Sequence, residues 1–564
     1  MKTIKSKILA AILVTLVGFS YYYIKLPALN IHSAGFWKFI IVLGILITAA
    51  FALTGMHFGI RKDDFYFDIT EKKKLFAKIS GGITIILFLI FIIGSVLSSP
   101  IINAKKYHDL IQIKNGDFEH DIKQISYQEI PLLDKDSAAL IGNRKMGSMV
   151  EYISQFEVAN DYTQINHNDR PIRVTPLKYG SLLKWFTNRS KGIPAYIKID
   201  MASQDAECVK LKEGMKYSEA EHFGRNIYRY LRFKYPTYIF DTLNFELNEQ
   251  GEPVYICPVK DYTIGLFGGQ TIHRVVIVNT ITGENTEYDV NKVPTWVDRV
   301  YSADLLISYY NYYGTLQHGY FNSILAQKDC LRTTNGYNYI ALDDDVWVYT
   351  GVTSVGNDQS NVGFVLMNQR TGQTKYYPIA GAEENSAMHS AEGKVQHLNY
   401  DATFPILLNI AGKPTYFICL KDSAGLVKQY AMVNIEKYTI VATGNTIEEC
   451  ENDYRNQLEG AASPEEKQAS KKEQTITGKI VRITQAVVGG NSHYYLMLEN
   501  NNEIFDVNVA EHINIIRYDT GHEITLTYIK KETPNASPET PEVSPGTSEL
   551  SGAESTVNTV TSLQ

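Results

Sequence analysis

Three apolar stretches within the first hundred residues constrain this chain more than any other feature. Ile8–Ile24, Phe39–Ile60 and Ile79–Leu97 contain no Asp, Glu, Lys or Arg. At about 1.5 Å per helical residue, each comes close to the roughly 30 Å of hydrocarbon in a bilayer. We therefore predict a membrane domain over residues 1–104, held in the lipid bilayer by three transmembrane helices.

Basic residues flank these stretches unevenly. Lysines precede the first stretch and crowd the loop between the second and third, whereas the loop between the first and second carries only Lys25 and Lys38. Lys and Arg next to membrane helices are retained in the cytoplasm. We predict a cytoplasmic N-terminus and extracytoplasmic residues after about 100. If the first stretch is instead a cleaved signal peptide, the residues beyond Pro100 still lie outside.

Composition narrows the class of the outer part. The net charge of −7 and the pI near 6.0 lack the basic excess of nucleic-acid-binding proteins, so that class is excluded. The 38 tyrosines favour β-rich structure. Five cysteines show neither a CxxC pair nor metal-finger spacing. We interpret them as buried thiols, with a bridge such as Cys257 to Cys419 left open.

A Gly-x-Pro-x-Tyr motif occurs at Gly192–Tyr196, Gly251–Tyr255 and Gly412–Tyr416, each time before a strand-like run. Glycine permits a positive φ and proline fixes φ without offering an N–H, so the motif is typical of a turn that enters a strand. Further apolar runs end at Asp200, Asn279, Asn368 and Asn434. These patterns predict short antiparallel sheets, each with one apolar face that a helix covers.

Helices are expected between these sheets. Ser218 to Glu221 forms a capping box that predicts a helix to about Tyr235, and further helices are expected over 294–313 and 382–396. The first helix would carry a basic stripe of Arg225, Arg229 and Arg232. That stripe is either a site for an anionic envelope polymer or a solvated face paired with local carboxylates.

Together, the Gly-x-Pro-x-Tyr opening, the strand ending in Asn or Asp and the Thr-Gly hairpin resemble the PepSY-type modules of bacterial envelope proteins, over about residues 150–445. In that family a helix packs on a small antiparallel sheet. The resemblance implies binding or regulatory modules without catalytic residues. It also implies structural roles for Gly192, Pro194, Tyr196, Gly251, Pro253, Tyr255, Thr282, Gly283, Gly412, Pro414 and Tyr416. The whole chain is similar to uncharacterised membrane-anchored proteins of Gram-positive bacteria.

The C-terminal part has a composition of its own. Short strand-like runs separated by Gly- and Asn-rich turns predict a small five-stranded barrel of the OB or SH3 class, with a strand expected at Ile513–Tyr518. The following residues are rich in Pro, Ser, Thr and Glu and are expected to be disordered. We thus predict an α+β chain with a first outer module at 105–245, a second at 246–332, a third and fourth within 333–454, a linker at 455–474, the barrel at 475–531 and a disordered tail at 532–564.

The polar clusters do not identify a reaction. The acidic run Asp343–Asp345, with Asn357 and Asp358, offers oxygens to calcium, but its spacing matches no known loop and favours a solvated turn. Gly265, Gly268 and Gly269 lack the strand-loop-helix context of a phosphate site and are interpreted as a flexible turn.

We therefore predict no catalytic, cofactor or metal residues, and a membrane-anchored, extracytoplasmic binding or regulatory protein of the bacterial cell envelope with a protein or envelope-polymer partner. One alternative is an envelope polymer- or peptide-processing enzyme, for which Asp343 and Glu383 are the first carboxylates to test. The other alternative is a subunit of a larger membrane complex.

Overall fold

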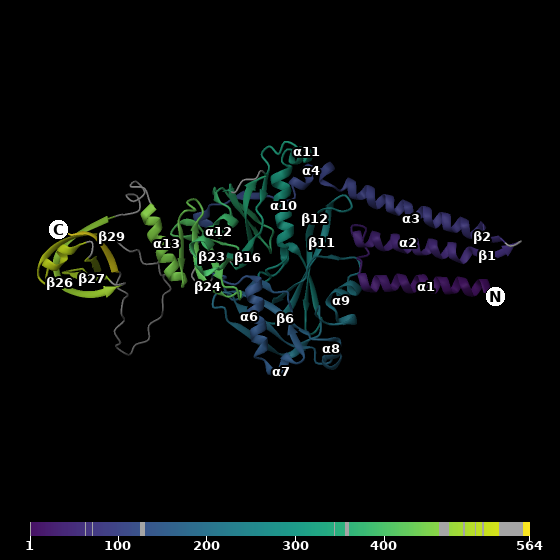
Figure 1. Ribbon diagram of the computed structural model, residues 1–564, viewed down its shortest axis with the longest axis horizontal. Helices are drawn as coiled ribbons and strands as arrows, with labels where there is room; N and C mark the ends of the chain where they lie inside the picture. The colour runs from purple at the N-terminus through teal and green to yellow at the C-terminus, as the bar shows by residue number, and fades with distance from the viewer. Residues whose placement is uncertain are drawn as a thin grey trace. The chain divides into compact units, whose positions relative to one another are not determined.

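The computed structural model describes residues 2–61, 64–69, 71–123, 130–342, 344–355, 360–461, 473–488, 491–501, 503–509, 512–529 and 557–563. The chain divides into two compact units, Met1–Arg455 and Asn456–Gln564. The first unit combines long N-terminal helices with several antiparallel sheets, so the mixed α+β class is confirmed (Figure 1).

Within the described residues, three helices are long and apolar enough to cross a membrane, as the sequence predicts. They are α1 (Lys2–Lys25), α2 (Ala34–Gly55) and α3 (Glu71–Leu97). The second helix ends before the apolar stretch does, because strands β1 (Met56–Arg61) and β2 (Asp64–Ile69) form a hairpin there. Figure 1 shows this hairpin and the N-terminus at the end of the helices that lies away from the sheets.

Four sheets of the first unit share one antiparallel strand order. In each, two short strands pair with the same edge of a long strand. The other edge of that strand pairs with the sheet's next strand along the chain, and a further strand follows. Sheet I contains β4 (Phe156–Val158), β5 (Thr163–Asn166), β6 (Pro171–Tyr179), β7 (Ile193–Asp200) and β8 (Ala206–Met215). Sheet II contains β9 (Ile239–Phe240), β10 (Asn244–Leu247), β11 (Pro253–Ile264), β12 (Gly268–Asn279) and β13 (Asn285–Asp289). Sheet III contains β14 (Leu331–Thr333), β15 (Asn338–Leu342), β16 (Asp345–Ser354), β18 (Gly363–Asn368) and β19 (Thr374–Tyr377), with β3 (Ile113–Asn115) parallel to β19. Sheet IV contains β21 (Asp401–Ala402), β22 (Ile406–Ile410), β23 (Lys413–Lys421), β24 (Val427–Asn434) and β25 (Val441–Gly444).

Consecutive sheets pack face to face. On β12, Val276 and Val278 enter the core shared with sheet I, whereas Val275 and Ile277 enter the core shared with sheet III. This division follows from the strand itself, because successive side chains point to opposite faces. The neighbouring sheet therefore covers these faces together with the expected helices, since Leu306 lies in the core of sheets II and III and Ala387 in the core of sheets III and IV.

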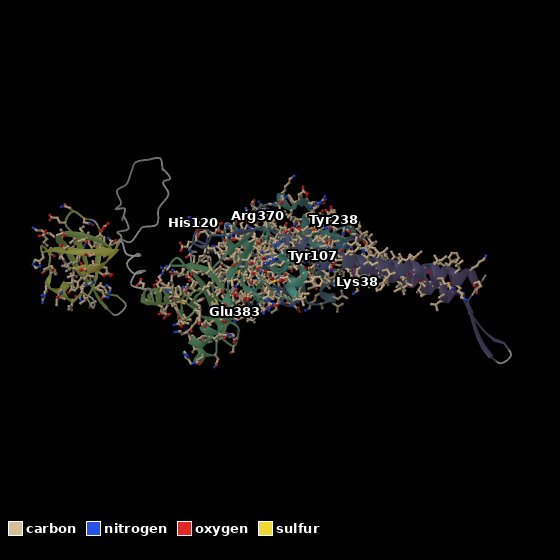
Figure 2. The ribbon with its side chains drawn as sticks, turned by 90° about the horizontal axis from the view of Figure 1, so that it is seen from above. Lys38, Tyr107, His120, Tyr238, Arg370 and Glu383 are labelled. Carbon is tan, nitrogen blue, oxygen red and sulfur yellow. The ribbon has the colours of Figure 1, made fainter. Side chains whose placement is uncertain are left out.

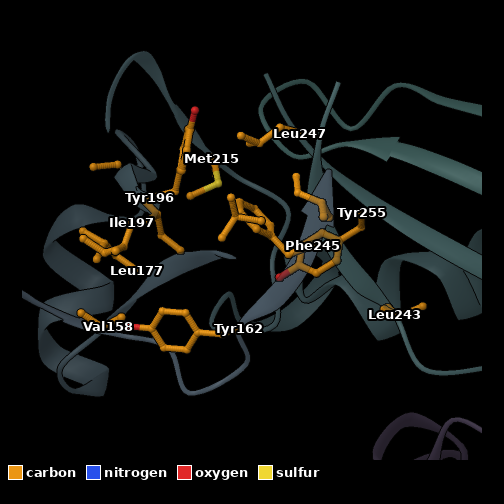
Figure 3. Close-up of a cluster of buried hydrophobic side chains, with 14 of the residues drawn as sticks. Val158, Tyr162, Leu177, Tyr196, Ile197, Met215, Leu243, Phe245, Leu247 and Tyr255 are labelled. Atoms are coloured by element: carbon orange, nitrogen blue, oxygen red, sulfur yellow. The ribbon is translucent and has the colours of Figure 1, made fainter. Parts of the chain in front are cut away.

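The core between sheets I and II shows how large side chains fill this space (Figure 3). Tyr196 of β7 and Met215 of β8 face Phe245 and Tyr255 of sheet II, and all four are buried. The rings of Phe245 and Tyr255 meet edge to face with centroids 5.7 Å apart. Aromatic pairs of this geometry add to the area-based gain of burial.

Sheets IV and I are joined through the segment that precedes α6 (Lys135–Gly147). Lys421 of β23 donates to the Asp134 carboxylate at 2.5 Å, and the Ser137 hydroxyl donates to the Gly425 carbonyl at 3.1 Å. Burial opposes ionisation of Asp134, but the hydrogen bonds from Lys421 and Ser137 lower its pKa below the ordinary value. The link is therefore an ionised carboxylate at neutral pH.

The strand ends repeat from sheet to sheet. Asn279 and Asn368 each accept hydrogen bonds from the backbone N–H groups two and three residues on, and Asp200 does the same. Side chains of Asn and Asp favour such turns. The three Gly-x-Pro-x-Tyr copies are not equivalent, however. Gly251 and Gly412 precede the first long strand of their sheets, whereas Gly192 precedes the second.

The helices differ in part from the predictions. The predicted helix start at Ser218 is wrong, because α9 (Ile227–Lys234) begins after Asn226. The Asn226 side-chain oxygen accepts a hydrogen bond from the backbone N–H of Arg229 and so caps this helix. The segment after Pro294 becomes helical at α10 (Ala303–Leu316), and α12 (Glu384–Lys394) forms about where it is expected. Further helices are α4 (Pro100–His108), α5 (Phe118–Asp121), α7 (Val150–Ile153), α8 (Leu182–Asn188), α11 (Tyr320–Ile324) and α13 (Ile447–Ala461).

The second unit contains five paired strands in the closed order β26-β27-β28-β30-β29. Their bounds are β26 (Glu473–Val488), β27 (Asn491–Leu498), β28 (Ile504–Asn508), β29 (Glu523–Ile529) and β30 (Val557–Leu563). The strand expected at Ile513–Tyr518 is wrong, because Ile513–Arg517 is a 3₁₀ helix. The expected disordered tail is wrong at β30, where Val560 is buried, while residues 530–556 lie outside the described residues. Assignment to the OB or SH3 class stays a prediction, as do the module boundaries.

The turn before β23 provides a test of backbone conformation. Gly412 has φ of 72°, which disfavours residues with a Cβ. We expect Gly412→Ala to lower the free energy of unfolding by about 1–2 kcal/mol. Thermal unfolding of the purified chain measures this change. The matched control is Gly393→Ala within α12, also in open space, which should raise stability by up to about 1 kcal/mol. Equal effects of the two changes would contradict the backbone argument.

Candidate functional site

A polar cavity of about 340 Å³ lies where parts of sheets I, III and IV meet. Arg173 reaches it from β6, Tyr339 from β15 and Cys419 from β23, while Arg299 comes from the loop before α10. The cavity is lined by Pro131, Leu132, Leu133, Asp134, Lys135, Tyr162, Arg173, Arg299, Tyr337, Asn338, Tyr339, Thr403, Phe404, Ile406 and Cys419. Charged and aromatic groups thus converge on one space from segments far apart in the sequence.

Arg173 is the most deeply buried cation of this cavity, with 6% of its surface exposed. Its Nε donates to the Leu133 carbonyl at 3.4 Å and its Nη2 to the Gln164 side-chain oxygen at 3.2 Å. Burial, reinforced by the neighbouring Arg299, lowers the pKa of Arg173 to about 10. The guanidinium therefore stays charged at neutral pH, in a place where an unpaired charge is costly.

Arg299 is half-buried and held by different partners. Its Nε donates to the Gln164 carbonyl at 3.3 Å and its Nη1 to the Tyr339 hydroxyl at 3.2 Å. Its Cζ lies 4.2 Å from the centroid of the Tyr339 ring, which is a cation–π geometry. These contacts fix the orientation of the Arg299 guanidinium beside the cavity.

Neither guanidinium forms an ion pair within the described part of the chain, whereas other arginines do so with carboxylates, as Arg370 does with Asp345. Asp134, which also lines the cavity, is engaged by Lys421. The Tyr162 hydroxyl is buried and has no hydrogen-bond partner among the described residues. The cavity therefore offers positive charge, which suits a small anion.

Two carboxylates lie buried behind Arg299. Glu246 accepts hydrogen bonds from the backbone N–H groups of Asp298 at 3.0 Å and Arg299 at 2.9 Å, and Asp298 accepts one from Asn166 N at 2.7 Å. Burial raises the pKa of both carboxyl groups, and the charge of Glu246 raises that of Asp298 further. This pair fixes the backbone that carries Arg299.

The predicted basic stripe of Arg225, Arg229 and Arg232 makes intramolecular contacts. The sequence leaves a polymer site and a solvated face paired with carboxylates as its two interpretations, and among the described residues these arginines contact backbone carbonyls and an aromatic ring instead of carboxylates. Arg232 donates to the Leu26 carbonyl at 2.9 Å and to three further carbonyls, and Arg229 lies over the Tyr23 ring at 4.3 Å. Arg225 donates to the Arg189 carbonyl. The first two arginines thus hold sheet II and its helix against the end of α1.

The glycine-containing loop at Gly265 is also a docking contact. The backbone N–H groups of Leu266 and Phe267 both donate to the Ser98 hydroxyl, at 2.8 and 3.1 Å. Phe267 packs edge to face against Phe91 of α3 with centroids 5.3 Å apart. In Figure 2, the labelled Tyr107 and Lys38 lie near this junction of sheets and helices. Because two of its N–H groups and the Phe267 ring contact α3 and the residue after it, this hairpin tip is a docking contact rather than a flexible turn.

Only part of the acidic run lies within the described residues. Asp343, Asn357 and Asp358 lie outside the described residues. Asp344 takes φ of 67° in the turn before β16, and Asp345 pairs with Arg370 at 2.6 Å. No group of three or more His, Cys, Asp or Glu side chains in the described residues is arranged to hold a metal ion.

The carboxylates of α12 accept hydrogen bonds that fix the helix to neighbouring segments. Glu384 is fully buried and accepts hydrogen bonds from Thr334 Oγ1 at 3.0 Å and Gly351 N at 2.6 Å. Glu392 accepts one from Ala402 N at 2.9 Å. Glu383 is the residue that precedes α12 (Figure 2). The other carboxylate of the enzyme alternative, Asp343, lies outside the described residues.

All five cysteines are free and buried, so the interpretation as buried thiols is confirmed and the Cys257–Cys419 bridge is not formed. Burial raises the pKa of Cys257 and of Cys419. Neither thiol is activated as a nucleophile by these surroundings.

No protein-family model matches this chain, and no curated protein matches it. Solved structures with some similarity include a tryptophan-to-alanine variant of the Synechocystis apocarotenoid oxygenase, with 9% identity, a TM-score of 0.17, and coverage of 53% of this chain and 67% of that chain. A chimera of apocarotenoid oxygenase (ACO) and RPE65 has 9% identity and a TM-score of 0.13, and this chain spans 48% of its length with 50% of its own. These TM-scores are too low to indicate a shared fold.

The buried carboxylate pair predicts a pH dependence. Folding raises the pKa values of both carboxyl groups. At pH values above the ordinary carboxyl pKa, the folded protein therefore binds more protons than the unfolded chain, and its stability falls as the pH rises. We expect Asp298→Asn to remove much of this fall and to be more stable than the parent at about pH 9, by on the order of 2 kcal/mol. Thermal unfolding between about pH 5 and about pH 9 measures the slope.

The matched control is Asp205→Asn, at an exposed position of sheet I. It should leave the slope of the parent chain unchanged. A parent-like slope in Asp298→Asn would show that the pair does not titrate in this range.

Proposed function

We propose that this chain is a membrane-anchored, non-catalytic binding protein of the bacterial cell envelope, whose central cavity holds a small anionic group, a carboxylate or a phosphate, of its ligand. The observation that carries the proposal is the pair of guanidinium groups, Arg173 and Arg299, that line one cavity without a described ion pair. A bound anion would offset the cost of burying these charges.

The surroundings of the two arginines support binding rather than turnover. Tyr337 and Tyr339 lie edge to face with centroids 5.6 Å apart and provide an apolar wall beside the charges. Strands hold part of the lining, since Arg173 lies on β6 and Tyr339 on β15, and prior ordering of such side chains reduces the entropy lost when a ligand binds. The PepSY resemblance, which also implies binding modules, remains a prediction.

The proposed placement of the sheets outside the cell rests on the charge pattern. The lysine-rich sequence around α3's start lies at the end of the helices opposite the sheets (Figure 1). Retention of lysine in the cytoplasm would leave the sheets and the cavity on the other side. The partner would then be a protein or polymer of the envelope.

The ligand proposal predicts anion binding by the purified full-length chain. Titration calorimetry with sodium phosphate and with sodium acetate, against sodium chloride at equal ionic strength, should reveal binding of at least one of the two anions. We expect Arg299→Gln to weaken it by about 10- to 100-fold, the usual effect of losing hydrogen bonds to a charged group.

Arg144→Gln on the exposed face of α6 is the matched control, because it removes the same charge outside the cavity. It should bind as the parent does. Absence of binding heat with both anions, or an equal loss in the control, would refute the cavity as an anion site.

The placement proposal predicts one-sided labelling. Because all five native cysteines are buried, a membrane-impermeant maleimide should react chiefly with a cysteine introduced at an exposed position. In intact protoplasts we expect labelling of Ser203→Cys in sheet I, whereas Lys72→Cys at the start of α3 should react after permeabilisation. The reverse pattern would put the sheets in the cytoplasm.

A further inference from the structure

The α2–α3 pair is closely packed through small and hydroxyl side chains. Gly44 lies directly against Thr84, and the Thr48 hydroxyl donates to Ser80 Oγ at 3.0 Å. Small residues let helix backbones approach in a membrane, and hydroxyl hydrogen bonds add to the association. At the N-terminal end of α3, Phe51 and Phe76 stack with ring centroids 5.5 Å apart.

Helix α1 meets this pair near its own C-terminal end. Gly18 is in contact with Leu43, and Tyr21 stacks on Phe39 with centroids 5.6 Å apart. Toward the start of α1, a groove of about 570 Å³ separates it from α2 and α3. Its walls are largely apolar and include Ala10, Val14, Ile47, Ala50 and Phe76.

Two lysines stand at one end of this groove. Lys72 and Lys73 belong to its lining, and Lys73 Nζ donates to Thr54 Oγ1 at 2.5 Å, which holds its side chain beside α2. None of the described residues that line the groove is acidic. An apolar channel within the membrane-spanning helices that ends in two ammonium groups is complementary to a hydrocarbon chain that ends in a phosphate.

We propose that this groove is a binding site for a single anionic phospholipid, with one acyl chain between α1 and the α2–α3 pair and the phosphate on Lys72 and Lys73. A zwitterionic lipid offers the same chain but less net charge to the lysines. The proposal is independent of the anion cavity in the sheets, since the two sites share no residue.

The test uses the full-length chain, purified in detergent and stripped of lipid. It is mixed with equal amounts of phosphatidylglycerol and phosphatidylcholine that carry the same acyl chains, and bound lipid is counted by native mass spectrometry. We expect one phosphatidylglycerol to be retained in preference to phosphatidylcholine. The double variant Lys72→Gln, Lys73→Gln should lose this preference by roughly 30-fold, as two lysines near an anionic headgroup contribute.

The matched control is Lys74→Gln, Lys78→Gln, which removes the same charge from the same helix outside the groove lining. It should retain phosphatidylglycerol as the parent does. A second variant, Ala11→Phe, fills the groove from an exposed position of α1 and should displace both lipids.

Three results would overturn the proposal. They are equal retention of the two lipids by the parent chain, equal losses in the two lysine double variants, and unchanged retention in Ala11→Phe. The first would leave only non-selective lipid contact, and the second would indicate diffuse charge attraction. The third would place the lipid elsewhere on the helices.

Discussion

The structure of the first unit depends on strands that are buried on both faces. Val275 to Val278 alternate between two cores, and Trp347 and Val348 of β16 do the same one sheet further along. Each of these strands therefore contributes side chains to two cores. A single isolated sheet would leave both of its apolar faces exposed to water. Stacking the sheets leaves polar space where their short strands converge, and the Arg173–Arg299 cavity occupies it.

This stack is fixed to the membrane helices by polar contacts. The Ser98 hydroxyl oxygen accepts hydrogen bonds from two backbone N–H groups of the β11–β12 hairpin. Arg232 donates hydrogen bonds to backbone carbonyls at the end of α1 and in the loop after α9. Backbone groups at helix ends lack intrahelical partners, so contacts of this kind satisfy groups that would otherwise need water. The sheets and the helices consequently behave as one compact unit.

The sequence predicts some of these features well and others poorly, for physical reasons. Long apolar runs without charge identify the three helices, and Asn279 and Asn368 mark strand ends because their side chains close local turns. No helix begins at Ser218, because the backbone of Ser218 forms a β-bridge with Asn226 and the helix begins only after Asn226. Uninterrupted valine runs already indicate burial on both faces, a signal that the one-faced prediction overlooks.

The cavity was less accessible to prediction. An arginine within the apolar run of β6 is an anomaly that indicates a special environment, since charged residues are rarely buried without a partner. Nothing local distinguishes Arg299, whose place depends on the contact of three distant segments. The strand β30 is similarly hidden, because its short β-branched pattern follows a long stretch with the composition of a disordered segment. That strand lies between β28 and β29 in the second unit, so neither neighbour has its full set of backbone partners until residues 557–563 have been synthesised. During translation, the edges of β28 and β29 therefore lack this partner strand while about thirty further residues are made, and unpaired strand edges can pair with other chains.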